Sequence, residues 1–224
     1  MKKVIVALFV FLSSQLMALP TINGPTGLVT MPTAEVMEYK ESMVAFDYQS
    51  NISDSNANQS FYKMNVGALE NTEFGFVGGS RPEEGVFLNF KWAMSSNAER
   101  FPLKMAVSFE NLTSNQRSDF YIVTSKKLRV DIGFHAGFKA LFADELGLSF
   151  MVGTDYSYSD DLVVMADFSS FQGGNYYLNV GANYKLMELT SIDNLYFRLS
   201  AENILHNVGQ DTYVNVGFAY TNQM

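Results

Sequence analysis

Two histidines are the side chains of this 224-residue sequence best suited to proton transfer near neutral pH, because an unperturbed imidazole titrates in that range. His135 lies in the segment Arg129–Lys139, on the same row as Asp131 and Lys139, and His206 lies in a polar stretch typical of a loop. Nucleophilic catalysis would need a serine beside a histidine, and no serine motif accompanies either one. Neither histidine has a second ligand at the spacing of a metal site. We therefore predict no enzyme, no metal site and no cofactor.

Charged and amide side chains recur on one row of the strand-like segments, where they could select ions or sugars along a lumen. The alternative is that they pair across a closed interior filled with side chains, because buried charges need partners. A barrel of about twelve strands lies between filled small barrels and open porins, so its size admits both, and we favour the paired interior. The lumen-facing candidates are Lys63, Asn65, Asn89, Lys91, Lys104, Glu110, Asp131, His135, Lys139, Asn179, Asn183, Arg198, Glu202 and Asn215.

The segment that holds His135 has two faces. From Val130 to Phe138 every second residue is apolar, and the residues between them are polar or glycine. Successive side chains of a β-strand point to opposite faces, and this two-faced pattern returns about every 15 residues. The predicted strands are Glu41–Ser50, Ser60–Glu70, Thr72–Gly79, Gly85–Met94, Leu103–Glu110, Asp119–Lys126, Arg129–Lys139, Gly147–Ser159, Asp161–Phe168, Asn175–Met187, Asn194–Asn203 and Thr212–Thr221.

The polar row distinguishes a membrane barrel from a soluble sandwich. It holds mostly Gly, Ser, Asn and Asp, and only 17% of all residues are charged, whereas a sandwich has a richly charged outer face. Tight turns such as Leu69–Thr72 alternate with longer loops such as Asn51–Gln59, as in an up-and-down barrel. We predict an all-β fold, a single antiparallel up-and-down transmembrane β-barrel of about twelve strands. Tyrosines expected in an interfacial girdle are Tyr156, Tyr158, Tyr176, Tyr184, Tyr213 and Tyr220.

Residues 1–18 have the features of a secretory signal peptide: a cationic start at Lys2 and Lys3, an apolar run to Leu12, and the small residue Ala18 at the expected cleavage site. The absence of cysteine excludes a disulfide scaffold. The net charge of −8 argues against a nucleic-acid partner. The predicted organisation is a signal peptide over 1–18, a Pro/Gly-rich segment over 19–40 and a barrel over 41–222, in the bacterial outer membrane.

The segment 19–40 holds three of the five prolines, which argues against a regular strand. Its stretch Gly24–Ala34 resembles the start of the YjbH-type outer-membrane β-barrel proteins, which are associated with exopolysaccharide loci. We expect a bent, extended segment tucked into the lumen or under its periplasmic mouth; the alternative is an irregular lead-in to the first strand. The residues that carry the resemblance are Gly24, Gly27, Leu28, Pro32, Thr33 and Ala34.

The resemblance implies a role in polysaccharide secretion or in organising the outer membrane. Full members of the family are much longer, and some carry a lipobox cysteine, so this chain looks like one barrel unit alone. We predict a small channel or an accessory of polysaccharide export. The alternative is a non-channel structural or surface-binding barrel. A barrel-type lipid hydrolase is disfavoured, because it would place its histidine on the lipid side and His135 falls on the other row.

The stretch Asn215–Tyr220, near the C-terminus, resembles the insertion signal that the barrel-assembly machinery reads, although no aromatic residue ends the chain. The partners that we expect are outer-membrane lipids, this machinery during insertion, and polysaccharide or export proteins. No nucleic acid is expected.

Overall fold

The computed structural model describes residues 19–54, 57–79, 85–94, 103–171, 174–186, 194–206 and 211–224. The predicted signal peptide, 1–18, lies outside the described residues. Within these ranges, no helix is long and apolar enough to cross a bilayer. The strands are β1 (Glu41–Asn51), β2 (Gln59–Leu69), β3 (Thr72–Gly78), β4 (Val86–Met94), β5 (Lys104–Glu110), β6 (Ser118–Lys127), β7 (Ile132–Phe142), β8 (Leu146–Ser157), β9 (Leu162–Phe171), β10 (Tyr176–Lys185), β11 (Leu195–His206) and β12 (Tyr213–Gln223).

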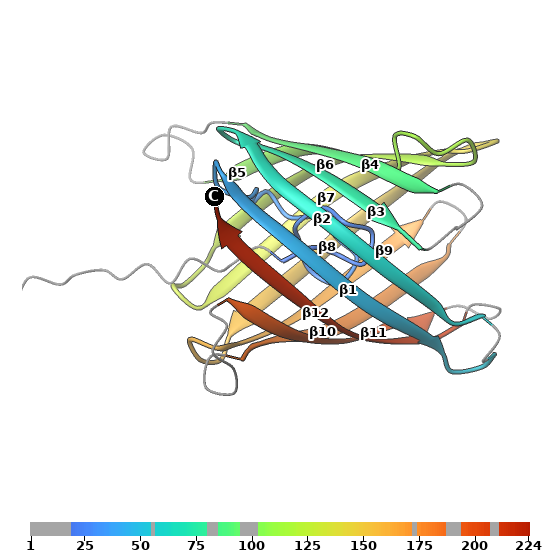
Figure 1. The fold of residues 1–224 in the computed structure, drawn as a ribbon. Coiled ribbons are helices and arrows are strands. Elements are labelled where there is room, and N and C mark those ends of the chain that lie inside the picture. Colours follow the sequence, from blue (N-terminus) through green and yellow to red (C-terminus); the bar gives the residue numbers. More distant parts are fainter. Residues whose placement is uncertain are drawn as a thin grey trace, which may run out of the picture.

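The strands form a closed antiparallel barrel in which each strand pairs with its neighbours in the sequence (Figure 1). β1 and β12 close the barrel, in a register that runs from Glu41 opposite Gln223 to Asn51 opposite Tyr213. Closure leaves no unpaired strand edge, which a hydrocarbon environment requires. The prediction of an up-and-down barrel of about twelve strands is confirmed.

The outward face of the wall is apolar. A row of four phenylalanines crosses β3, β4, β5 and β6: Phe74, Phe90, Phe109 and Phe120 have successive ring centroids 5.2, 6.5 and 4.9 Å apart. Aromatic pairs across neighbouring strands stabilise a sheet beyond the area that they bury. Together with exposed side chains such as Phe46, they give the outer face the character that lipid contact needs.

The barrel has two mouths. The proximal mouth carries the start of β1, the end of β12 and the connections that follow even-numbered strands; the distal mouth carries the other connections. The proximal turn between β2 and β3 has only two residues, Glu70 and Asn71, and the distal connection between β1 and β2 covers residues 52–58. However, the distal connection 143–145 is short and the proximal connection 186–194 is long. The predicted separation of tight turns from long loops is therefore incomplete.

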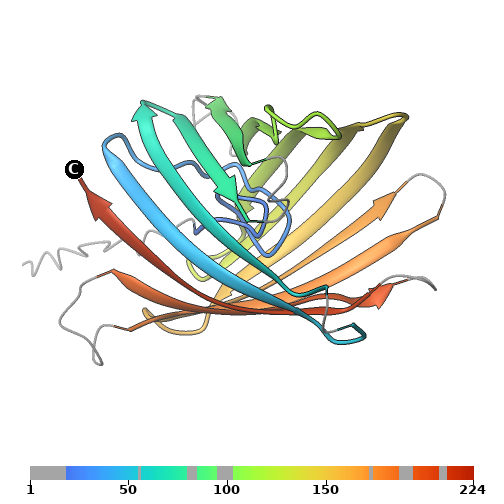
Figure 2. The ribbon, with the colours of Figure 1, turned by 45° about the vertical axis from the view of Figure 1, so that its right-hand side comes forward.

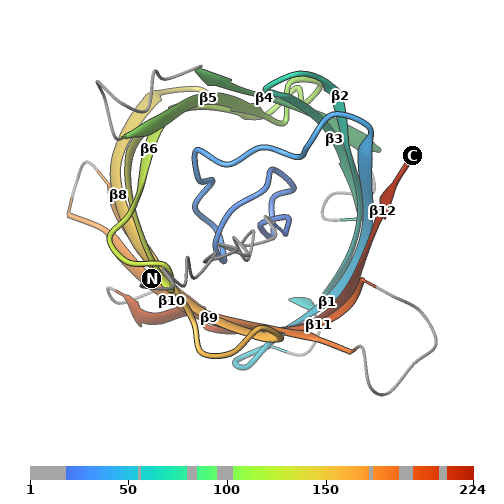
Figure 3. The ribbon, with the colours of Figure 1, turned by 90° about the vertical axis from the view of Figure 1, so that its left-hand side faces the viewer.

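Residues 19–40 add no strand to the wall. They fold into the lumen, and Figures 2 and 3 show this segment in blue, enclosed by the strands. We call residues 19–37 the plug. The chain leaves the lumen at Lys40, whose N–H donates to the carbonyl of Gly67 at 2.8 Å, and enters β1 at Glu41. Of the two expectations for this segment, the position inside the lumen is the one observed.

The plug explains why β6 has apolar residues on both rows. Tyr121 and Val123 point inward and pack against Met31 and Ala34 of the plug. The segment over β9 has mixed rows for the same reason, because its inward Met165 belongs to an apolar cluster with other plug residues. The inner wall is apolar where the plug packs on it and polar elsewhere, so the alternation expected of an empty lumen is interrupted at these strands.

Candidate functional site

The plug is folded on itself. Its backbone hydrogen bonds join plug residues to one another, as in the bond from the Ile22 N–H to the Val29 carbonyl at 2.9 Å. Gly27 sits where a Cβ atom would lie 2.3 Å from the carbonyl oxygen of Met31, so the motif needs a residue without a side chain at this point. Two isolated bridges close within the plug, Pro20–Thr26 and Gly27–Pro32.

Two carboxylates on opposite sides of the barrel hold N–H groups of the plug. Glu73 on β3 accepts hydrogen bonds from the N–H and the hydroxyl of Thr26, at 3.0 and 2.7 Å. Asp167 on β9 accepts the N–H groups of Val29 and Thr30, at 2.9 and 3.0 Å, and the Thr30 hydroxyl at 2.8 Å. Since β3 and β9 face each other across the ring, the plug is clamped from two sides. Hydrogen bonds to an ionised acceptor are about twice as strong as neutral ones.

Wall side chains also donate to carbonyl groups of the plug. Lys63 Nζ donates to the carbonyl of Thr21 at 2.8 Å, and Arg198 Nη2 donates to that of Pro20 at 2.5 Å. Both cations also bind Asp47 Oδ2, at 2.6 and 3.0 Å. The irregular backbone of the plug is thus satisfied by the wall, as buried polar groups require. Three further donors are Lys91 at Thr26, Asn65 at Gly24 and Asn89 at Asn23, over 2.7 to 3.0 Å.

His135 lies between two wall residues, one of which binds the plug. The Oγ of Ser125 lies 2.7 Å from Nδ1 of His135, and Oδ1 of Asp155 lies 2.5 Å from Nε2. A carboxylate only accepts hydrogen bonds, so Nε2 carries a hydrogen atom. Ser125 Oγ also accepts the N–H of Ala34 at 2.8 Å. A chain of hydrogen bonds therefore links the plug to β6, β7 and β8.

These three residue types also form the nucleophilic triads of hydrolases. In this lumen, however, Ser125 is 2% exposed, its oxygen is engaged by Ala34, and it lines neither of the two cavities described below. No serine motif accompanies His135 in the sequence, but the register of β6 and β7 sets Ser125 directly opposite it. The geometry gives this set a role in holding the plug rather than in attacking a substrate.

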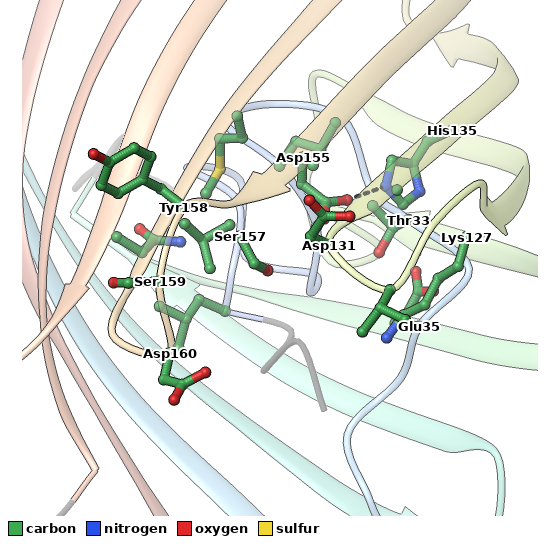
Figure 4. Close-up of a pocket in the computed structure, with 18 of the residues that line it drawn as sticks. Thr33, Glu35, Lys127, Asp131, His135, Asp155, Ser157, Tyr158, Ser159 and Asp160 are labelled. Carbon is green, nitrogen blue, oxygen red and sulfur yellow. Dashed lines mark hydrogen bonds and ion pairs between the residues drawn. The ribbon is translucent and has the colours of Figure 1, made fainter. Parts of the chain in front are cut away.

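Two cavities lined by described residues flank the plug. The proximal cavity, of about 470 Å³, lies between the plug and the ends of β6 to β11. Figure 4 shows Glu35, Asp131 and Asp155 projecting into it beside His135. The distal cavity, of about 450 Å³, is lined by residues such as Asn23 of the plug and by the distal ends of β1, β2, β6, β11 and β12. The two cavities have no lining residue in common, so the plug lies between two vestibules.

The charges at the plug are coupled to those of the wall. Burial raises the pKa of the Glu35 carboxyl, but electrostatic interactions with His135, Lys104 and Lys91 and a hydrogen bond from Thr33 outweigh burial, and the net pKa is below its ordinary value. The ionised form of Glu35 is therefore favoured while the plug is seated.

At the distal mouth, burial lowers the pKa of the Arg117 guanidinium. Its two hydrogen bonds to Asp119, at 2.9 and 2.8 Å, and the charge of that carboxylate outweigh burial, so the net pKa is raised. The loop between β5 and β6 is thereby tied to the start of β6 by a two-bond ion pair, the strongest geometry for such a pair.

Most predicted lumen residues point inward, and several contact one another or the plug. The carboxylate of Glu110 accepts the hydroxyl of Tyr121 at 2.6 Å, and Lys139 binds Asp119 at 2.9 Å. Lys104 lies on the inward row at the proximal mouth, with its side chain exposed to solvent and 3.9 Å from Glu35. The predicted residues that are buried are Lys63, Asn65, Asn89, Lys91, Glu110, His135, Lys139, Asn179, Arg198 and Asn215; those partly exposed are Asp131, Asn183 and Glu202.

Other contacts join predicted residues to one another or to residues that were not predicted. Asn215 donates to Glu202 at 2.6 Å, and Gln49 donates to the same carboxylate oxygen at 2.8 Å. Asn179 donates to Asp167 at 2.7 Å. Asp131 lies 3.2 Å from Arg129 in the turn before β7.

The functional residues absent from the predicted set are mainly acidic. Glu73 and Asp167, the two clamps of the plug, lie on strands whose alternation is obscured by phenylalanine or by inward apolar residues. Asp155 follows the clean alternation of β8, and this pattern could have identified it. Tyr213, predicted in the interfacial girdle, instead lines the distal cavity, because it lies on the same inward row of β12 as Asn215. The side chain of His206 is not described.

The sequence matches no protein-family model and no curated protein. Among solved structures, the KdgM porin has a TM-score of 0.57 at 11% identity, over 80% of this chain and 98% of that chain; its complex with disordered oligogalacturonate gives the same values. The COG4313 outer membrane channel from Pseudomonas putida F1 has a TM-score of 0.58 at 12% identity, over 87% of this chain and all of that one. This similarity supports the predicted location in the bacterial outer membrane. The chain has the barrel fold of these outer-membrane proteins.

Proposed function

We propose that the protein is an outer-membrane channel and that the plug is its gate. The observation that carries this proposal is that the plug separates two vestibules without contributing to the hydrogen-bond ladder of the wall. The bridges of the plug are internal, and side chains such as Glu73 and Asp167 hold it in place. The plug can therefore move while every strand pair stays intact. The shared fold with porins and channels supports the same function.

A reversible cross-link tests the gate. The ideal Cβ position of Gly181 on β10 lies 2.9 Å from a Cγ atom of Val29 in the plug, close to the sulfur-to-Cβ spacing across a disulfide. The protein has no cysteine, so the pair Val29→Cys and Gly181→Cys would form the one possible bridge. In planar bilayers, we expect conductance in dithiothreitol and its loss on oxidation. The single variants should conduct equally in both conditions.

Absence of conductance in the wild type and in the reduced variant would favour a second function, a barrel that does not conduct. The observation behind this alternative is the number of buried polar contacts that hold the plug, among them Lys63, Lys91 and Arg198 on its carbonyl groups. Such a protein would serve as a structural or surface-binding barrel. The porin-like fold supports the prediction that the chain is not an enzyme, which stays a prediction.

We further propose that the channel assists polysaccharide export, with polysaccharide or export proteins as partners. The support is the YjbH-type motif, in which Gly27 and Pro32 form a bridge that shapes the plug. The test is a chromosomal deletion complemented by wild-type protein or by the Val29→Cys, Gly181→Cys variant. Exopolysaccharide in the medium should fall on deletion. Under oxidising conditions it should return with the wild type and not with the cross-linked variant. An unchanged yield on deletion would overturn this role and leave the channel proposal standing.

Outer-membrane lipids and the barrel-assembly machinery remain proposed partners of the wall. The apolar outward face supports the first, and the pattern of Asn215, Gly217, Phe218 and Tyr220 on β12 supports the second. Replacement of Phe218 by Ser should reduce the amount of folded protein in the outer membrane, measured by heat-modifiable migration on gels.

A further inference from the structure

The inward face of β8, β9 and β10 is negatively charged for most of its length. Its acidic side chains are Asp155 and Asp167, and its basic side chain, Lys185, lies at the proximal end of β10. Asp167 is 1% exposed, and its hydrogen-bond donors in the described part of the chain are neutral groups of Val29 and Thr30 of the plug and the amide of Asn179 at 2.7 Å. Among the described residues, no lysine or arginine forms an ion pair with it.

Release of the plug would leave Asp167 without a positively charged neighbour, unlike the other inward carboxylates at the plug. The wall cations stay near carboxylates of the wall: Lys63 and Arg198 share Asp47, Lys139 binds Asp119, and Lys91 lies opposite Glu73 in the register of β3 and β4. Asp167, by contrast, would keep only the neutral amide of Asn179. A carboxylate in a narrow lumen needs donors or a positive charge, so this wall becomes a place for cations when the plug moves.

The proximal cavity continues the same acidic wall outward. Five carboxylates and three lysines line it, together with His135. Asp155 is 8% exposed, and its buried Oδ2 atom has no hydrogen-bond partner among the described residues. The buried Oε2 atom of Glu35 has none there either. Buried carboxylate oxygens that face a cavity without a donor indicate that the ligand of the cavity supplies positive charge or N–H and O–H groups.

We infer that the solutes of this channel are small cations, drawn into the proximal cavity by its carboxylates and passed along Asp155 and Asp167. This inference rests on the proposed channel function. The solute replaces the N–H groups of the plug at Asp167, so conduction and plug release use the same carboxylate. Anions are disfavoured, because the inward charges along β8, β9 and most of β10 are negative and repel them.

The test is the reversal potential of the full-length protein in a planar bilayer under a tenfold gradient of KCl. Channel openings are recorded from the wild type and from the Ser125→Ala variant, which loses the acceptor of the Ala34 N–H. We expect a potential with the sign of K⁺ diffusion. In the turn variant Asp160→Asn, Asp161→Asn, the ratio of K⁺ to Cl⁻ permeability should fall about threefold, because both side chains line the proximal cavity.

The matched control removes two charges at the other mouth. Asp144→Asn with Glu145→Gln changes exposed residues of the distal turn and should leave the permeability ratio within about 20% of the wild type, since charges beyond a Debye length are screened. Asp167→Asn should lower the ratio further than the turn variant does. A potential of zero or of the sign of Cl⁻ overturns the inference while leaving the channel intact. Absence of any opening in both sources overturns the channel itself.

Discussion

The wall and the plug are stabilised by different kinds of bonds. The wall is a continuous backbone ladder, in which β1 pairs with β12 over the full length from Glu41 to Asn51. The plug is held to the wall by side chains that reach its backbone, such as Glu73, Asp167 and Lys91. A ladder of backbone bonds persists when any one side chain is changed, whereas side-chain bonds are lost one residue at a time. The barrel can therefore be stable while the position of the plug is adjustable.

The largest expected effect separates these two kinds of bonds. In the double variant Glu73→Gln, Asp167→Asn, each amide turns N–H donors toward plug groups that are themselves donors. Hydrogen bonds to charged groups contribute about 1.5–3 kcal/mol each, so the conducting fraction should rise by more than about tenfold. Single-channel recording measures it. Glu110→Gln is the control, since Glu110 accepts the hydroxyl of Tyr121 on the wall, and a similar rise there would contradict the role of the clamps.

A substitution on the lipid side should break the wall and spare the gate. Phe90→Arg places a charge in the outward row of phenylalanines and should cost about 2–4 kcal/mol of folding free energy if that position lies at the bilayer midplane. Urea titration in detergent or vesicles, followed by gel shift, measures the loss. The protein that remains folded should conduct as the wild type does, and Phe90→Leu should be close to neutral. Altered gating in the folded fraction would mean that wall and plug are not independent.

A moderate effect is expected at the hydrogen-bonded chain behind the plug. His135→Gln interrupts the chain between Ser125 and Asp155. A lost hydrogen bond of about 1 kcal/mol corresponds to roughly fivefold more conduction. Ser125→Ala should give a similar increase and, combined with His135→Gln, little more, because both act on the bond to Ala34. Additive effects of the two substitutions would show that they act separately.

The smallest effect is a pH dependence at Glu35. Because its pKa in the seated plug is below the ordinary 4.5, its contribution to seating is complete above about pH 4.5 and is lost as the pH falls through the lowered value. The wild type should therefore open more often at acidic pH. Glu35→Gln should open about twofold more than the wild type at neutral pH, and the difference should shrink as the pH falls below 4.5, as expected for a partly exposed charge. A difference that does not change with pH would rule out titration of Glu35 as its cause.

The wall could be predicted from the sequence because its cause is local. Alternation along a strand is visible in segments such as Val130–Phe138, and twelve of them lead to a barrel. The clamps could not be predicted in this way. Asp167 meets Val29 and Thr30, which are 138 and 137 positions away, and no periodicity encodes such a contact. The motif around Gly27 was visible and a position in the lumen was one of the expectations for it, but the wall residues that hold it there are set by tertiary contacts.

Lys40 has a consequence for how the molecule is assembled. Its N–H is bound to the carbonyl of Gly67 on β2, and its own carbonyl accepts the N–H of Met224, just beyond β12. At Gly67, a Cβ atom would lie 1.8 Å from the carbonyl oxygen of Glu38, so the exit of the plug lies directly against β2. One residue thus joins the base of the gate to both strands that flank β1. These bonds are complete only when β1 has paired with β12. Closure of the barrel would therefore convert a loosely tethered N-terminal segment into a gate with a fixed pivot at Lys40.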